Sequence, residues 1–343
     1  MAFSRRAWLQ ALGVTSVIGA AASRLGGQTP KSHAGAHENN AMGLVGRVSS
    51  DQLSPSRYLR TWNFSDVDAA QRSKYYNETK RPDGSLLREY HIYAVDREIE
   101  IAPGLYFPAW TYNGQVPGPT IRATEGDRVR ITFQNAGTHP HTMHFHGWHP
   151  PAMDGALHGQ EVQPGKTFVY EFDADPFGLH LYHCHTVPLK RHIHKGLYGA
   201  FIIDPRGGRP PADEFVMVMN SFDTNFDAEN EVYAVNTIAN AYMTEPIEVT
   251  VGRLVRVYLI NVTEFDLINS LHLHGMFFDV YRTGTRTTVD DHTDTVMLCQ
   301  GERAVLETTF RYPGKFMFHA HQSEFAELGW MGMFEAVEPR RDT

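Results

Sequence analysis

Short runs rich in β-branched, aromatic and other apolar residues recur along the chain from Glu89 onward, separated by glycine and proline. Such runs predict β-strands, and where apolar and polar residues alternate, as in 128–133, successive side chains lie on opposite faces of the strand. In the first half of the chain, the predicted strands cover 91–95, 120–123, 128–133, 167–172 and 199–203. In the second half they cover 215–219, 247–251, 254–260 and 304–310. Many short strands with frequent turn residues are typical of a β-sandwich.

The second half of the chain repeats the motifs of the first half in the same order. The matching segments are 126–133 with 252–259, 144–147 with 272–275, and 183–185 with 319–321. The repeat period is about 130 residues, which is the size of a domain rather than of a solenoid unit. We therefore predict an all-β fold of two antiparallel β-sandwich domains with Greek-key connections, over 89–206 and 212–339. The proline- and glycine-rich segment 205–211 separates them.

The N-terminal part of the chain predicts export. Arg5 and Arg6 precede an apolar stretch that ends in small residues at Ala22, as in a twin-arginine signal peptide. This stretch is too short for a membrane span. We expect a signal peptide over 1–22, a linker or arm over 23–88, and a periplasmic or extracellular mature protein. Loss of the two arginines takes the net charge from −8 to −10, which argues against nucleic acid as a partner.

Four pairs of histidines with one residue between them are the most informative chemical feature of the sequence. They are His144/His146, His183/His185, His272/His274 and His319/His321. Alternation along a strand puts both imidazoles of a pair on one face, and it turns Cys184, between His183 and His185, toward the other face. One strand can therefore serve two metal sites.

A blue copper site needs two imidazoles and one thiolate in a trigonal plane, with a weak axial group or none. We predict that Cys184, His141 and His192 supply this plane. His141 lies three residues before His144, which places it on the face opposite to the His144/His146 pair. The axial position falls to Leu197, which cannot donate to copper and should raise the reduction potential. His194 competes with His192, and the spacing to the axial position favours His192.

The second half keeps both histidine pairs and lacks the blue site. Ala320 replaces the cysteine, and Asn269 stands at the position of His141. The eight paired imidazoles are the right number for a three-copper cluster, so we expect four coppers per chain. Zinc is a weaker alternative, because three or four ligands would suffice for it.

The other cysteine, Cys299, lies in a strand-like run. In an exported protein two cysteines could form a disulfide, but a copper ligand is the better use of Cys184. We therefore expect Cys299 to be a buried, inert thiol and assign it no role.

Over about 89–338 these motifs resemble those of the two-domain multicopper oxidases, which are small laccase-like relatives of the copper nitrite reductases. The resemblance implies two cupredoxin domains, with the blue (type 1) copper in the first. It implies that His144 and His272 bind the type 2 copper. The type 3 pair would take His146, His183, His185, His274, His319 and His321. In this family the blue copper accepts electrons one at a time, and the trinuclear cluster reduces dioxygen to water.

Copper nitrite reductase is the main alternative. The resemblance implies that those enzymes have aspartate in place of His144, lack a counterpart of His185, and have methionine in place of Leu197. Each difference adds a cluster ligand or raises the potential, so we favour oxygen reduction. A non-enzymatic copper-binding or copper-resistance protein is a third alternative. Copper storage, however, does not need a blue copper site that is connected through the chain to a copper cluster.

Reduction of oxygen to water consumes protons, so acidic groups should lie near the cluster. Asp154 resembles the cluster-side aspartate of the family. Glu324 and Glu327 closely follow His321, and each is a candidate proton relay or a structural ion-pair partner. The family-level expectation for the electron donor is a small phenol or aromatic amine. The resemblance also implies a homotrimer in which each cluster lies between the first domain of one subunit and the second domain of the next, with ring closure preventing open polymerisation.

Overall fold

The computed structural model describes residues 47–48 and 76–339 of the chain. The predicted signal peptide and most of the predicted arm therefore lie outside the described residues. In the described part, no helix is both long enough and apolar enough to cross a membrane.

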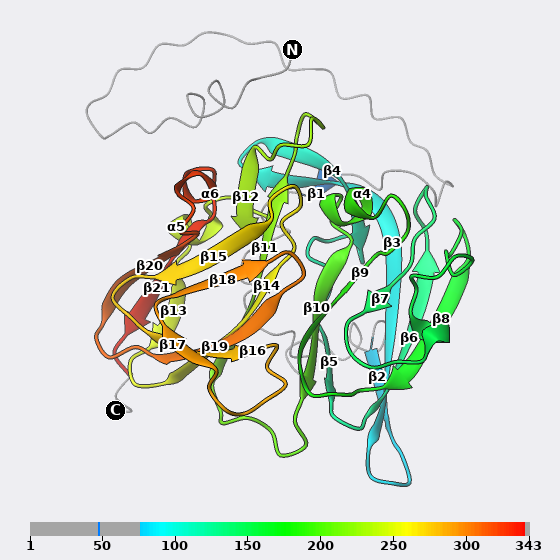
Figure 1. Ribbon diagram of the computed structural model, residues 1–343, viewed down its shortest axis with the longest axis horizontal. Coiled ribbons are helices and arrows are strands. Elements are labelled where there is room, and N and C mark those ends of the chain that lie inside the picture. Colours follow the sequence, from blue (N-terminus) through cyan, green and yellow to red (C-terminus); the bar gives the residue numbers. More distant parts are fainter. Residues whose placement is uncertain (1–46, 49–75, 340–343) are drawn as a thin grey trace. The chain divides into compact units, whose positions relative to one another are not determined.

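The first domain contains two sheets (Figure 1). One sheet comprises β1 (Arg47–Val48), β2 (Tyr76–Lys80), β3 (Leu86–Ala102), β4 (Leu105–Tyr112), β6 (Arg128–Asn135) and β8 (Thr167–Asp173). The other comprises β5 (Ile121–Thr124), β7 (His144–Phe145), β9 (Gly178–His183) and β10 (Tyr198–Asp204). Helix α4 (Leu189–His194) joins β9 to β10, and a short 3₁₀ turn, η2, covers Pro151–Met153. One apolar core draws residues from both sheets, including Phe133, Tyr170, Tyr182 and Phe201.

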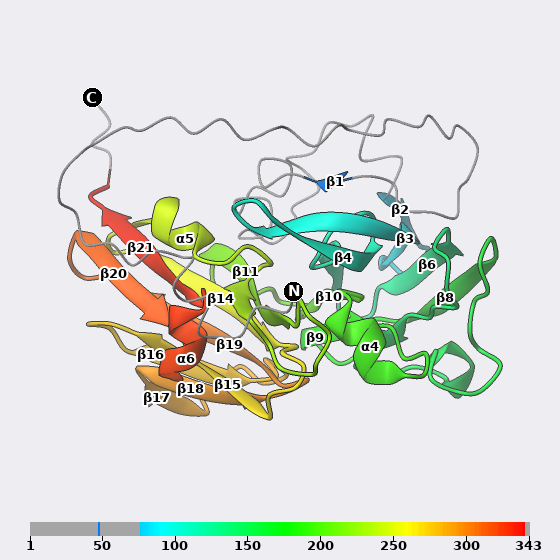
Figure 2. The same cartoon turned by 90° about the horizontal axis from the view of Figure 1, so that it is seen from above.

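The second domain repeats this plan, as Figure 2 shows from another direction. One sheet comprises β11 (Asp213–Phe222), β12 (Val232–Val235), β14 (Leu254–Asn261), β16 (Phe278–Arg282), β17 (Asp291–Thr293) and β19 (Arg303–Thr309). The other comprises β13 (Ile247–Thr250), β15 (Ile268–Leu273), β18 (Thr295–Cys299), β20 (Gly314–His319) and β21 (Met331–Val337). Two short helices, α5 (Ala241–Thr244) and α6 (Ser323–Glu327), complete it.

The predicted all-β fold of two cupredoxin-like sandwiches is confirmed. Most neighbouring strands are antiparallel, but each sheet also contains a parallel pairing. In the first domain β3 pairs with β6, and in the second domain β11 pairs with β14 in the same way. Greek-key connections explain these parallel pairs, because they bring strands that are distant in sequence side by side.

The first sheet begins earlier than the sequence indicated. Strand β2 and the start of β3 form a hairpin with Tyr76 opposite Tyr90, within the segment expected to be an arm. The hairpin was missed because β2 is buried only at Tyr76 and exposes its four other residues, which leaves no alternation to detect. The first domain therefore includes residues 76–88.

Polar contacts connect the two sandwiches of one chain. The amide of Leu179 in β9 donates to the carbonyl of Thr283 at 2.7 Å. Arg122 of the first domain forms ion pairs with Asp204 at 2.7 Å and with Glu214 of the second domain at 2.8 Å. The backbone contact links β9 to the second domain, and the Arg122–Glu214 ion pair links β5 to β11.

Candidate copper centre

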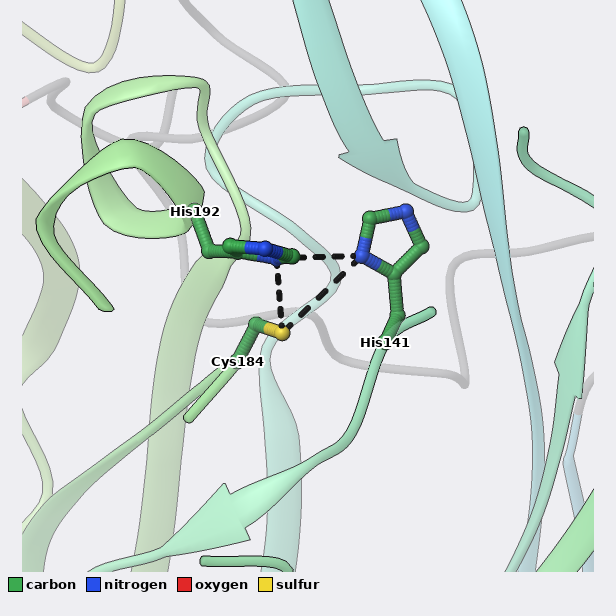
Figure 3. A group of neighbouring side chains, drawn as sticks. All are labelled: His141, Cys184 and His192. Atoms are coloured by element: carbon green, nitrogen blue, oxygen red, sulfur yellow. Dashed lines mark hydrogen bonds between the residues drawn. The ribbon is translucent and has the colours of Figure 1, made fainter. Parts of the chain in front are cut away.

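Three side chains of the first domain converge at the edge of its core (Figure 3). Nδ1 of His141 lies 3.2 Å from Nδ1 of His192. The sulfur of Cys184 lies 3.2 Å from the same atom of His192 and 3.9 Å from that of His141. All three residues are buried. Two imidazoles and one thiol thus direct their ligand atoms toward a common point.

Each of these residues is positioned by a different local element. Cys184 directly follows strand β9, His192 lies on α4, and His141 is held by paired backbone hydrogen bonds with Val162. Leu197 is fully buried in the core cluster that contains Cys184, and its carbonyl accepts the Cys184 amide at 3.0 Å. The loop between β9 and β10 therefore carries the thiol, one imidazole and the predicted axial residue.

Burial controls the protonation of this group. It lowers the pKa of His141 to about 3 and that of His192 to about 4, so both rings are neutral at neutral pH. Burial also raises the pKa of the Cys184 thiol, because a thiolate is poorly solvated there. A bound cation would lower the pKa of the thiol again, because it would stabilise the thiolate. The group is therefore better suited to binding a metal ion than to holding an unpaired thiolate.

The equivalent place in the second domain has no such group. Asn269 is fully buried, and its amide donates to the Thr263 hydroxyl at 3.1 Å. Ala320, at the position of the cysteine, is also fully buried. In the second sandwich, a buried amide and a buried methyl group therefore occupy the positions of the imidazole and the thiol.

A second group in the first domain consists of four imidazoles. The ring of His144 lies 5.4 Å from that of His146, 5.1 Å from that of His183 and 5.2 Å from that of His185. Nε2 of His146 lies 3.3 Å from Nε2 of His183. Nδ1 of His185 is buried without a hydrogen-bond partner. Such an orphaned ring nitrogen calls for an explanation, and its place in a group of four imidazoles fits a site that holds a metal ion.

The second domain holds a matching group of four imidazoles. The ring of His272 lies 4.9 Å from that of His274, and 5.4 Å from those of both His319 and His321. Nε2 of His274 lies 2.9 Å from Nε2 of His319. The internal repeat of the sequence thus appears as two half-sites of the same design.

Backbone carbonyls hold the outer nitrogens of several of these rings. Nδ1 of His144 contacts the carbonyl of Asp154 at 2.8 Å, and Nδ1 of His183 contacts that of Cys184 at 3.0 Å. In the second domain, Nδ1 of His272 contacts the carbonyl of Asp294 at 3.0 Å, and Nδ1 of His319 contacts that of Ala320. A proton held on Nδ1 leaves Nε2 free to bind a metal, which is the usual arrangement of metal-binding histidine.

Within the described part of one chain, the two half-sites form separate groups. The half-site of the first domain instead opens into a cleft of about 440 Å³, which Val262, Glu264, Gln300 and Gly301 of the second domain also line. The four imidazoles of the first domain therefore line open space, and those of the second domain are half-buried or exposed. The ligand set is rich in neutral nitrogen, with one sulfur and no carboxylate at the sulfur site, and it fits copper better than magnesium or calcium.

Family models described as multicopper oxidase match residues 96–208 and 209–340. A solved structure titled as a multicopper oxidase is 53% identical, covers 82% of this chain and 96% of its own, and superposes with a TM-score of 0.78. The chain belongs to the multicopper oxidases. These proteins are oxidoreductases that bind copper.

Copper nitrite reductases are also similar to this multicopper oxidase. The copper-containing nitrite reductase of Neisseria gonorrhoeae is 29% identical over 248 residues, which are 66% of this chain and 62% of the reductase. A copper nitrite reductase structure from Nitrosomonas europaea is 27% identical, with 73% and 94% of the two chains covered and a TM-score of 0.68. Laccase 1 of Metarhizium acridum is 42% identical over 102 residues, which are 28% of this chain and 16% of the laccase. The chain therefore spans less than two thirds of the length of the curated relatives named here.

The other candidate residues of the sequence lie at different distances from the two groups of ligands. The carboxylate of Asp154 lies 3.3 Å from Nδ1 of His144. Glu324 and Glu327 lie on α6 with exposed side chains. Nε2 of His194 accepts the amide of Asp223 at 3.0 Å, so this ring faces the second domain rather than Cys184.

One expectation for the cysteines was wrong. Cys299 is exposed rather than buried, because it lies at the end of β18, an edge strand of its sheet. Buried and exposed residues alternate along β18, and Cys299 is at an exposed position. The structure gives no role to this thiol.

Sequence reasoning missed two residues at the half-sites. Asp294 holds His272 through its carbonyl as Asp154 holds His144. The half-buried guanidinium of Arg303 in the second domain donates to Nδ1 of His146 at 3.3 Å and to the Leu179 carbonyl at 2.9 Å. The His-Thr-Asp-Thr segment at 292–295 could have indicated Asp294, but its distance from His272 differs from that between Asp154 and His144.

Proposed function

We propose that this multicopper oxidase oxidises a small donor, a phenol or aromatic amine, and reduces dioxygen to water with four coppers per chain. The observation that carries the proposal is the pair of matching half-sites, each with three imidazoles around a central fourth one. A single type 2 copper would need only about three of these eight ligands. The excess of ligands supports a trinuclear cluster.

In this proposal His141, Cys184 and His192 hold the type 1 copper, with Leu197 at the axial position. His144 and His272 hold the type 2 copper. The type 3 pair is held by His146, His183, His185, His274, His319 and His321. When bound, these coppers supply one-electron chemistry at the first site and multi-electron reduction of oxygen at the second.

Cys184 links the two kinds of site through the chain itself. It directly follows His183 and precedes His185, and both of these belong to the imidazole group around His144. Electrons that enter at the thiolate therefore have a short covalent route to two cluster ligands. The buried aromatic core around Cys184 excludes water from this route.

Reduction of dioxygen to water consumes protons, and carboxylates near the cluster can deliver them. Asp154 and Asp294 each orient one proposed type 2 ligand and also place a carboxylate near it, at 3.3 Å and 3.9 Å from Nδ1. We propose that Asp154 moves protons to the cluster, with Asp294 as its counterpart in the second domain. Glu324 and Glu327 are further relay candidates on α6, next to His321.

The Asp154 proposal predicts a loss of turnover without loss of copper. Asp154→Asn keeps the backbone carbonyl that holds His144, so we expect full copper loading and oxygen consumption reduced by about 10- to 100-fold. Oxygen uptake and metal analysis check this. Glu161→Gln is the matched control, because Glu161 lies on the same segment with its nearest titratable partner being the fully exposed His158 at 3.9 Å. An Asp154→Asn variant with normal turnover would remove Asp154 from the proton route.

The proposed assembly is a homotrimer in which each cluster joins the first domain of one subunit to the second domain of the next. Support comes from the separate half-sites of the single chain, which leave four imidazoles facing a cleft in the first domain. The proposed cellular route remains export by the twin-arginine pathway, based on Arg5 and Arg6 in residues outside the described part.

Copper stoichiometry and acceptor choice test the proposed function directly. We expect four coppers per chain after full reconstitution, one of them giving an intense thiolate-to-copper absorption. With a phenolic donor, dioxygen should be consumed faster than nitrite. The specific rival is nitrite reductase, which the similarity to the Neisseria gonorrhoeae protein favours. One or two coppers per chain, with nitrite as the preferred acceptor, would establish that rival.

A further inference from the structure

Two buried polar atoms beside the proposed type 1 site lack hydrogen-bond partners. One is Nε2 of His141, and the other is Oδ1 of Asp96. Both residues are buried, with His141 fully so and Asp96 7% exposed. Unpaired buried polar atoms are costly and rare, so each of them requires an explanation.

The two atoms flank the same residue. A methyl group built on Gly137 would lie 3.1 Å from Oδ1 of Asp96 and 3.2 Å from Nε2 of His141. Asp96 in β3 also pairs with Trp110 in β4, and paired residues direct their side chains to one face of the sheet. The Trp110 ring lies 5.3 Å from the His141 ring. Asp96 is therefore on the face that backs the site.

The chemistry of the two atoms is complementary. Nδ1 of His141 faces Cys184 and His192, so a metal bound there requires the proton of His141 to be on Nε2. That N–H is a donor without an acceptor, and Oδ1 of Asp96 is an acceptor without a donor. The other carboxylate oxygen of Asp96 accepts the Thr138 hydroxyl, which fixes the orientation of the carboxylate.

We propose that Asp96 is a positioning residue for the type 1 copper, whose carboxylate accepts the Nε2 proton of His141 directly or through one water molecule. A carboxylate behind a histidine ligand fixes its ring and increases its basicity. Because a more basic ligand stabilises the oxidised metal, Asp96 lowers the reduction potential that Leu197 raises. This inference rests on the assignment of His141, Cys184 and His192 to the blue copper.

The test compares Asp96→Asn and Asp96→Ala with the wild-type copper-loaded protein. We expect the reduction potential of the blue copper to shift upward in both, measured by redox titration of the thiolate-to-copper band. Asp127→Asn is the matched control, because Asp127 is also a buried aspartate of this domain but binds Arg88 at 2.6 Å. It should lower the melting temperature and leave the potential unchanged. An unchanged potential in a blue Asp96 variant overturns the inference.

Pulsed electron paramagnetic resonance of the unmodified protein tests the same inference without a variant. The remote ring nitrogens of the two histidine ligands should give unequal quadrupole couplings, because the proposed Asp96 contact involves the His141 ring and not the His192 ring. Equal couplings would overturn the role of Asp96. If the wild-type protein shows no blue copper signal, the proposed function itself fails, and that failure is distinct from either result for Asp96.

Discussion

Replacement of Cys184 by serine is expected to abolish both the blue colour and the oxidation of any donor, to background levels. The thiolate is the strongest ligand of the proposed type 1 site, and it is also the proposed exit for electrons toward His183 and His185. A hydroxyl at this position cannot replace it, because serine is not deprotonated at neutral pH in a buried site. The visible spectrum and oxygen uptake of the reconstituted variant give the measurement, and metal analysis should still find the cluster coppers.

The other cysteine provides a matched control for this experiment. Cys299 is exposed on β18, so Cys299→Ser should keep the colour and the activity. His319→Ala should give the opposite phenotype to Cys184→Ser, with a blue protein that does not consume oxygen. A Cys184→Ser protein that remained blue would refute the assignment of the first domain.

Two inactive variants are expected to restore each other's activity when their subunits are mixed. One variant carries His144→Ala and His146→Ala, and the other carries His319→Ala and His321→Ala. Each half-site stands alone in the described chain, so an interfacial cluster would take one half from each of two subunits. In randomly mixed closed trimers, roughly a quarter of the interfaces would then hold eight intact ligands, and we expect about that share of wild-type oxygen uptake.

The controls for the mixing experiment follow from the same geometry. Each variant exchanged only with itself should stay inactive, and mass spectrometry of differently labelled subunits should establish that exchange took place. Proven exchange without recovered activity would place the cluster within one chain. A fully active monomer in sedimentation would lead to the same conclusion.

Several features of the fold and of the candidate site could be predicted because they depend on local sequence. Alternation of apolar residues located strands in both sandwiches, such as β6 and β13, in which buried positions alternate with more exposed ones. The repeat of the histidine pairs indicated two copies of one domain. The outward polar pattern of β2 gave no such signal, and a strand paired mainly through its backbone was therefore assigned to the arm.

The choice among neighbouring polar residues depended on contacts between distant segments. His192 and His194 lie two residues apart in the same segment after Cys184. The turn of α4 directs His192 toward the thiol and His194 toward Asp223. The pairing of β15 with β18 brings Asp294 to His272, across 22 residues of chain. The spacing to Leu197 favours His192 in the sequence, but no local pattern indicates that Asp294 reaches His272 or that His194 reaches Asp223.

By itself, the sequence determined that this protein is built from two related β-sandwiches and that their histidine pairs and Cys184 are suited to copper. Strand periodicity is a local property, so it fixes which side chains share a face before any tertiary contact forms. Only the tertiary structure decided that Arg303 reaches His146 from the other domain, that Asp96 and His141 both lie beside Gly137, and that Cys299 is exposed. These outcomes depend on which sheets pack together and which strand lies at an edge, and such long-range packing leaves no periodic trace in the chain.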